Sequence, residues 1–96
     1  MWNTDAKYTI VPTSKFKNHY ATYIKNGFDI DELDEIINML ANGDHLGSEY
    51  HDHPLKGRLK GFRGCHVRPD WVLIYKRTDK DLVLALRDTG THSVYV

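Results

Sequence analysis

The chain has 96 residues, with 13 basic and 13 acidic side chains, six histidines and a single cysteine, Cys65. This length predicts one domain spanning residues 1–96, and the lone cysteine excludes an intrachain disulfide. No apolar run approaches the roughly 18–20 residues that cross a bilayer, and the N-terminus lacks the basic and apolar regions of a signal peptide. We therefore expect a soluble cytoplasmic protein without membrane contact.

The balanced charge hides a strong asymmetry along the chain. Residues 26–55 contain acids but no Lys or Arg, and residues 56–77 reverse the sign. The bases of the second segment are Lys56, Arg58, Lys60, Arg63, Arg68, Lys76 and Arg77. Asp70 is the only acid among them. A row of bases on one element attracts a polyanion, although a solvated face with scattered charges explains the same composition.

The N-terminal half predicts one short strand followed by two amphipathic helices. The strand covers residues 7–13, and from Ser14 the apolar spacing of a helix face continues to a stop at Gly27. The second helix begins at Asp29, an N-cap that Glu32 follows three residues later as in a capping box. The predicted buried positions are Phe16, Tyr20, Tyr23 and Ile24 in the first helix and Leu33, Ile36, Ile37 and Leu40 in the second.

The C-terminal half changes to the period of strands. We expect strands over residues 57–67, 70–77 and 82–87, with a hairpin turn at 77–81. The second of these strands is apolar on both faces, as a central strand would be. The order β-α-α-β-β-β predicts an α+β fold, in which an antiparallel sheet carries both helices on one face and the basic row on the other.

Histidines are frequent and concentrate after residue 44, whereas His19 in the first helix is interpreted as a surface residue. Because imidazole titrates near neutrality, a cluster of histidines suits proton transfer. Ordinary loop histidines are one interpretation, and a metal site at His51, His53, Cys65 and His66 is another. That spacing matches no standard zinc site, so we predict no metal and no cofactor. Acid–base cleavage of a phosphodiester is the third interpretation, with the candidates His53, His66, Asp70 and His92.

Three separated motifs carry a family resemblance: DHPLKG at 52–57, HVRPDW with LIYK at 66–76, and GTH at 90–92. Together they closely resemble the YafQ branch of the RelE-type bacterial toxins. The resemblance implies a RelE-like fold and an mRNA interferase, the endoribonuclease toxin of a type II toxin–antitoxin system. Such a toxin cuts mRNA in the A site of the 70S ribosome by metal-independent attack of a ribose 2′-OH on the adjacent phosphate. A cognate DinJ-like antitoxin holds it inactive, and operator DNA is bound only through the antitoxin complex.

The resemblance assigns roles residue by residue. It places catalytic functions on His53, His66, Asp70 and His92. Trp71 would stack a nucleobase, with core packing as the alternative. The predicted substrate-binding set is completed by Lys56, Arg58, Lys60, Arg63, Arg87 and Tyr95. We expect His92 to be the general acid for the leaving 5′-oxygen, and Asp70, with His66 or His53, to accept the 2′-proton.

Two positions depart from the family pattern. Asp88 stands directly before TGTH where an Arg is expected, and strand alternation turns Arg87 to the other face unless a bulge intervenes. Val96 stands where a C-terminal aromatic is expected, and Tyr95 would substitute for it. These departures leave two alternatives: a catalytically weak toxin-fold module that mainly binds an antitoxin and operator DNA, and a ribosome-independent RNase.

Overall fold

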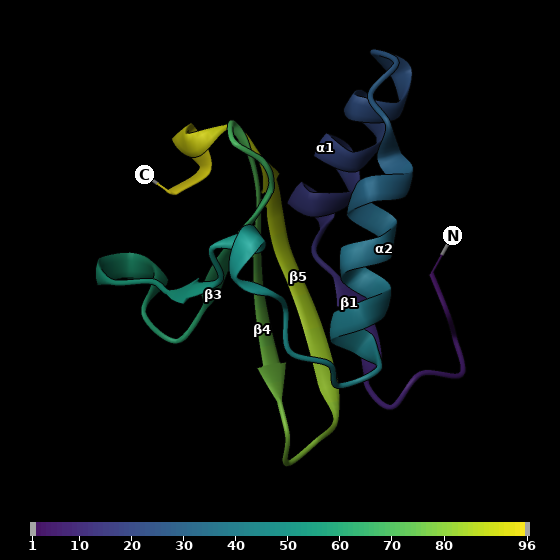
Figure 1. Cartoon of the computed structure of the whole chain (residues 1–96), viewed down its shortest axis with the longest axis vertical. Coiled ribbons are helices and arrows are strands. Elements are labelled where there is room, and N and C mark those ends of the chain that lie inside the picture. The colour runs from purple at the N-terminus through teal and green to yellow at the C-terminus, as the bar shows by residue number, and fades with distance from the viewer. Residues whose placement is uncertain (1, 96) are drawn as a thin grey trace.

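The computed structural model describes residues 2–95 and has an α+β fold. Its elements are β1 (Thr9–Pro12), α1 (Ser14–Lys25), α2 (Ile30–Ala41), η1 (Ser48–Tyr50), β2 (His53–Pro54), η2 (Gly57–Leu59), β3 (Arg63–Arg68), β4 (Trp71–Thr78), β5 (Val83–Gly90) and η3 (His92–Tyr95), where η marks a 3₁₀ helix. Both helices lie on one side of the sheet, as predicted, whereas η2 and η3 lie on the other (Figure 1). No helix within residues 2–95 is long and apolar enough to cross a membrane.

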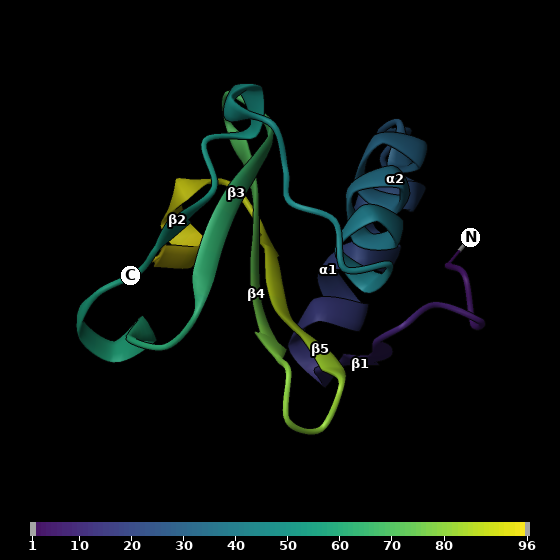
Figure 2. The same cartoon turned by 60° about the horizontal axis from the view of Figure 1, so that its bottom comes forward.

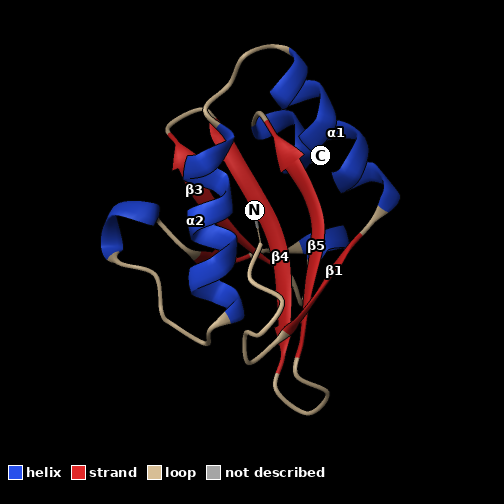
Figure 3. Ribbon diagram, turned by 90° about the vertical axis from the view of Figure 1, so that its right-hand side faces the viewer, coloured by secondary structure: helices blue, strands red, loops and turns tan. Residues whose placement is uncertain are grey.

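The sheet has the strand order β1-β5-β4-β3-β2, with β4 at its centre as predicted. Strands β2 to β5 pair antiparallel, but β1 pairs in parallel with β5, Thr9 opposite Val83. The prediction of a wholly antiparallel sheet is therefore wrong, and the sheet is mixed. The chain passes through both helices and strands β2 to β4 before β5 runs beside β1 in the same direction. Figure 3 shows β1 alongside β5 at this edge.

The core lies between the helices and the sheet. All four apolar positions predicted for α2 are at most 2% exposed, and Phe16 of α1 is fully buried against them. Tyr20 and Tyr23 pack on this core from the side, but Ile24 is 51% exposed, so its predicted burial is wrong. Each fully buried Leu, Ile or Phe contributes about 1.5–3 kcal/mol, so this layer holds the sheet against the helices.

The start of α2 is tied to the turn that carries Asp70. The Asp29 carboxylate accepts a hydrogen bond from the Asp31 backbone N–H at 3.2 Å, which confirms the predicted N-cap. Glu32 does not complete a capping box. Its carboxylate instead accepts two hydrogen bonds from Arg68, at 2.6 and 2.9 Å. This bidentate pair links α2 to the end of β3, immediately before the β3–β4 turn.

The predicted strand over 57–67 is wrong for its first half. Gly57, the first residue of η2, and Gly61, in the turn after it, adopt left-handed backbone conformations with φ of 63° and 96°, which interrupt extended structure. Strand β3 consequently begins only at Arg63. Arg58 and Lys60, which were expected on this strand, therefore lie in η2 and the turn after it, and the exposed Lys56 immediately precedes η2.

The second face of the sheet is covered rather than open. Leu73 and Tyr75 of β4 belong to the helix-facing core, and the alternating Val72 and Ile74 are nevertheless completely buried. The η2 segment and η3 lie over this side, as Figure 2 shows from a second direction. Contact is close, since a Cβ added at Gly64 of β3 would lie 2.6 Å from the hydroxyl oxygen of Tyr95.

Candidate active site

Four imidazoles from three segments gather at one end of the sheet. The ring of His66, in β3, lies 5.2 Å from that of His92 and 5.5 Å from that of His51, measured between ring centroids. The ring of Tyr95 lies 5.8 Å from His92 and 6.3 Å from His53. The β2–β3 pairing and η3 thus bring together all three predicted histidines, and each ring is at least partly exposed to an incoming substrate.

Asp70 completes this cluster from the β3–β4 turn. Its carboxylate lies 3.2 Å from Nδ1 of His92, and the two side chains are 83% and 50% exposed. We expected Asp70 to work with His66 or His53, but the contact that the structure shows is with His92. A carboxylate only accepts hydrogen bonds, so at this distance Asp70 orients the imidazole through its Nδ1–H.

His53 is held by a different kind of partner. Its Nδ1 lies 2.7 Å from the main-chain carbonyl oxygen of His51. A carbonyl only accepts, so Nδ1 of His53 carries the hydrogen, and in the neutral ring the lone pair lies on Nε2. His51 has a left-handed φ of 50°, which residues other than Gly rarely adopt. Sequence reasoning gave His51 no role beyond the rejected metal site, because nothing local reveals this backbone conformation or the neighbouring His66 ring.

Comparison with known proteins identifies the family. Residues 8–95 match the family described as the bacterial toxin of type II toxin–antitoxin systems, YafQ. The chain belongs to the YafQ toxin family. The mRNA interferase toxin YafQ of Escherichia coli K12 is 47% identical over 66 residues, which are 68% of this chain and 70% of the relative.

Solved structures agree with this assignment. YafQ from E. coli BL21(DE3) superposes with a TM-score of 0.83 at 35% identity, covering 91% of this chain and 96% of the other. A metal-bound toxin from Helicobacter pylori gives 0.85 at 39% identity, covering 93% and 99%. YafQ in the E. coli DinJ–YafQ toxin–antitoxin complex gives 0.82 at 36% identity, covering 92% and 96%. The resemblance inferred from the three motifs and the predicted RelE-like α+β fold are confirmed.

Cys65 takes no part in this YafQ-family site. It is completely buried in the helix-facing core, whereas its neighbour His66 points to the other side of β3. Burial raises the pKa of the Cys65 thiol to about 12, which keeps it protonated and a poor ligand. Within residues 2–95, no group of three or more His, Cys, Asp or Glu side chains is arranged to hold a metal ion.

Trp71 does not present a stacking surface for a nucleobase, and that prediction is corrected. Its side chain is in the core and the residue is only 3% exposed. Tyr23 stacks on the indole at 4.9 Å, Phe28 packs edge-on at 5.7 Å, and the indole N–H donates to Thr89 Oγ1 at 2.9 Å. The alternative of core packing is the correct one for this residue.

The basic segment divides into two groups. Arg63 donates to Asp52 at 3.1 Å, and Arg68 is held by Glu32. Arg77 donates to two main-chain carbonyls, one in the last turn of α2 and one just after the helix. These three arginines stabilise the fold through charge-assisted hydrogen bonds. The exposed bases Lys56, Arg58 and Lys60 on the η2 segment, together with the exposed Lys76 of β4, form the part of the predicted row that lies outward toward solvent.

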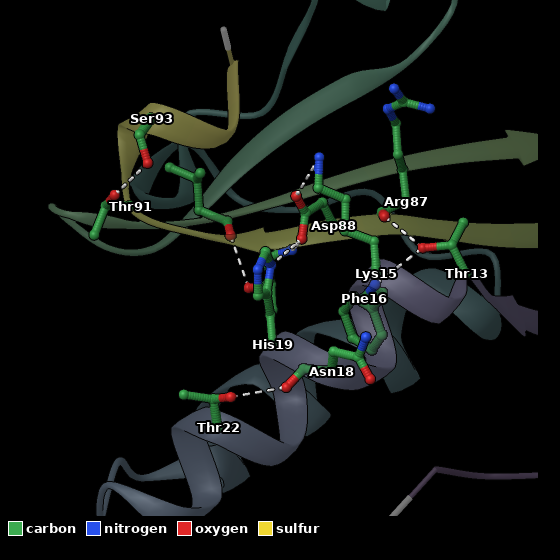
Figure 4. A network of polar contacts seen from close by, with 12 residues as sticks. Thr13, Lys15, Phe16, Asn18, His19, Thr22, Arg87, Asp88, Thr91 and Ser93 are labelled. Atoms are coloured by element: carbon green, nitrogen blue, oxygen red, sulfur yellow. Dashed lines mark hydrogen bonds and ion pairs between the residues drawn. The ribbon is translucent and has the colours of Figure 1, made fainter.

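The departure at Asp88 has a structural reason. Asp88 is 3% exposed, and its carboxylate meets His19 Nδ1 at 2.5 Å, the Thr89 backbone N–H at 2.8 Å and the Lys15 ammonium at 3.9 Å. Figure 4 shows these side chains converging between β5 and α1. The interpretation of His19 as a surface residue holds only in part: its side chain is 42% exposed, but its Nδ1 contacts the buried Asp88 carboxylate.

Strand β5 contains the β-bulge that was needed to turn the Arg87 side chain to the face of the sheet that carries the imidazoles. Tyr75 pairs with Leu86 and Ile74 pairs with Asp88, so Arg87 is the additional residue in β5. Its side chain points away from α1 (Figure 4), and its guanidinium carbon lies 5.2 Å from the centre of the Phe62 ring. Arg87 thus faces the side of the sheet that carries the imidazoles.

The C-terminal aromatic is only partly available. Burial raises the pKa of the Tyr95 hydroxyl, which lies against Gly64. The Tyr95 ring makes edge-to-face contacts with the rings of His53 and His92. Val96, the second departure from the family pattern, lies outside the described residues.

Proposed function

We propose that this chain is an mRNA interferase, the toxin of a type II toxin–antitoxin system, which cuts mRNA in the ribosomal A site by metal-independent acid–base chemistry. Membership of the YafQ family and the name of the E. coli relative, mRNA interferase toxin, support the reaction class. The observation that carries the proposal is the pair of unlike Nδ1 partners. A carbonyl holds His53 and a carboxylate holds His92, so the two imidazoles suit opposite proton transfers.

His53 is the general base in this mechanism. With Nδ1–H bonded to the His51 carbonyl, Nε2 is free to remove the proton of the ribose 2′-OH. The 2′-oxygen then attacks the adjacent phosphorus. A base positioned within hydrogen-bond distance contributes about 10²–10⁴-fold to such a step.

His92 is the general acid. Its Nδ1–H donates to the Asp70 carboxylate, which orients the ring, and Nε2–H would protonate the 5′-oxygen as the phosphorus–oxygen bond breaks. The products are a 2′,3′-cyclic phosphate and a 5′-hydroxyl. After the reaction His53 is protonated and His92 neutral, so exchange with solvent restores both partly exposed rings.

His66 and nearby cations would stabilise the charge that develops on the phosphate. The His66 ring lies beside that of His92, at the centre of the cluster. Arg87 and the exposed bases of the η2 segment surround the same side of the sheet and would hold the RNA backbone. The presence of Asp88 does not oppose catalysis, because its carboxylate contacts His19 of α1 and not the imidazole cluster.

The partners follow from the same proposal. The substrate is mRNA on the 70S ribosome in the cytoplasm, and a DinJ-like antitoxin would silence the toxin by covering the exposed bases. E. coli YafQ has been crystallised in complex with DinJ. A disordered antitoxin segment that folds on binding wraps a large surface and is removed when the free partner is degraded. Operator DNA would be bound only through this complex.

Induction in cells tests the proposal. The wild-type chain should arrest growth and create new mRNA 5′ ends at fixed positions within codons, and co-expression of the neighbouring antitoxin should restore growth. His53→Ala should abolish the new ends, whereas His45→Gln, an exposed loop histidine, should leave them unchanged. Unaltered mRNA ends during growth arrest by the wild type would refute the assigned activity.

A further inference from the structure

A hollow of ≈ 500 Å³ opens beside the imidazole cluster, between η1 and the β3–β4 turn. Its lining residues are Glu49, Tyr50, His51, His66, Val67, Arg68 and Pro69. His51 and His66 belong to both the hollow and the cluster, so a molecule in the hollow lies directly beside the proposed reaction centre. The mechanism above uses none of the other lining residues.

The walls of the hollow are fixed by the fold. Tyr50 and Val67 pack on the core from its edge, and the bidentate pair with Glu32 holds the Arg68 guanidinium. Walls that are already in place lose little conformational entropy when a ligand enters. The volume is within the range of about 300–1,000 Å³ that is usual for small-ligand sites.

The chemistry of the lining suits a nucleobase. The Tyr50, His51 and Pro69 rings offer flat surfaces for stacking, and Glu49 is the acidic residue of the lining, with its carboxylate close to Gly47 just before η1. Proteins recognise single-stranded RNA by stacking unpaired bases on such rings and bonding to the base edges. An RNA strand whose phosphate lies among His53, His66 and His92 would pass this hollow with the neighbouring nucleotide.

We propose that the hollow binds one nucleobase next to the cleaved phosphate and that Glu49 reads its edge. This inference rests on the proposed function and adds a determinant of sequence preference. A carboxylate only accepts hydrogen bonds, so it favours an edge with an exocyclic amino group, as in adenine, cytosine or guanine. Uracil presents two carbonyl oxygens around a single N–H, and these oxygens are repelled by Glu49.

Nucleotide titration tests the site without cleavage. Purified protein labelled with ¹⁵N is titrated with AMP, GMP, CMP and UMP, and backbone amide shifts are followed. The expected result is a saturable change confined to residues 49–51 and 66–69, weaker for UMP than for at least one amino-bearing nucleotide. Glu49→Gln should remove this difference, and Glu35→Gln, an exposed acid on α2, should retain it. Equal responses to all four nucleotides, or none at this hollow, would overturn the inference.

Cleavage of an mRNA library randomised around the cut tests the same site in function. Glu49→Gln should change the base preference at one nucleotide beside the cut by about tenfold, the effect of one lost base-edge contact, and leave other positions unchanged. A uniform loss of rate or an unchanged preference would contradict a base-reading role. If the wild-type chain cleaves nothing, the proposed function fails, and the nucleotide titration still decides whether the hollow binds a base.

Discussion

Replacing His92 with glutamine separates its chemical role from any structural one. Gln retains a polar side chain of similar length but does not transfer a proton. If His92 is the general acid, His92→Gln should slow single-turnover cleavage on ribosomes by about 10²-fold or more. Ribosome affinity should stay close to that of the wild type, because the interaction with the 5′-oxygen is made mainly in the transition state.

The structure limits what His92 contributes to stability. The His92 and Asp70 side chains are 50% and 83% exposed, and an exposed pair of this kind is worth about 0–1 kcal/mol. A 10²-fold loss of rate corresponds to about 2.7 kcal/mol of transition-state stabilisation. The predicted kinetic effect therefore exceeds any loss of folding free energy from the broken contact.

Three measurements on the same preparations check the prediction: single-turnover cleavage, ribosome binding and urea denaturation. His45→Gln is the matched control, since it removes an exposed imidazole in the loop after α2. His51→Gln is not a suitable control, because its ring lines the cluster beside His66. Cleavage by His92→Gln at the wild-type rate, or a loss of rate that matches a loss of binding, would refute the acid assignment.

Asp88→Asn should lower the free energy of unfolding by about 1–3 kcal/mol in urea titrations, because Asp88 is a buried carboxylate paired with His19. The double variant with His19→Gln should cost less than the sum of the single ones, and strict additivity would contradict the pairing. Charge reversal of Arg58 and Lys60 together should weaken ribosome association and flatten its salt dependence, and an unchanged salt titration would exclude backbone binding by this segment. Since burial raises the pKa of the Cys65 thiol to about 12 from 9.0, the folded state keeps this proton longer and the free energy of unfolding should fall as the pH rises from 9.0 toward 12. Denaturation of Cys65→Ala should show a shallower fall, and equal slopes would argue against it.

Features set by local sequence were predicted well. The α2 stripe, the Asp29 cap and the doubly apolar β4 each depend on residues within a few positions of one another, and the structure confirms all three. That the three candidate histidines meet was predicted from the family motifs, while spacing alone left ordinary loop histidines as an alternative. The parallel pairing of β1 escaped prediction, because it depends on the path of the chain through both helices.

Features that depend on contacts between residues far apart in the sequence could not be predicted. Glu32 pairs with Arg68 instead of completing the expected capping box, and the Asp88 carboxylate contacts His19 of α1. Trp71 has the same sequence neighbours whether it stacks a base or packs on Tyr23, so only the tertiary structure decides. Left-handed backbone conformations at Gly57 and Gly61 break a strand that alternation alone favoured, which places Arg58 in η2 and Lys60 in the turn after it.

Removing the attacking group from the substrate tests the central claim most directly. An mRNA with a single 2′-deoxy nucleotide immediately 5′ of the mapped cut is placed in the ribosomal A site and challenged with the toxin, beside the all-ribose mRNA. If the 2′-OH attacks the phosphate, the all-ribose mRNA should yield a 2′,3′-cyclic phosphate and a 5′-hydroxyl. The deoxy mRNA should not be cleaved at the deoxy position, although the toxin binds both ribosome complexes equally. Cleavage of the deoxy substrate, or products with a 5′-phosphate, would contradict attack by the 2′-OH among these imidazoles.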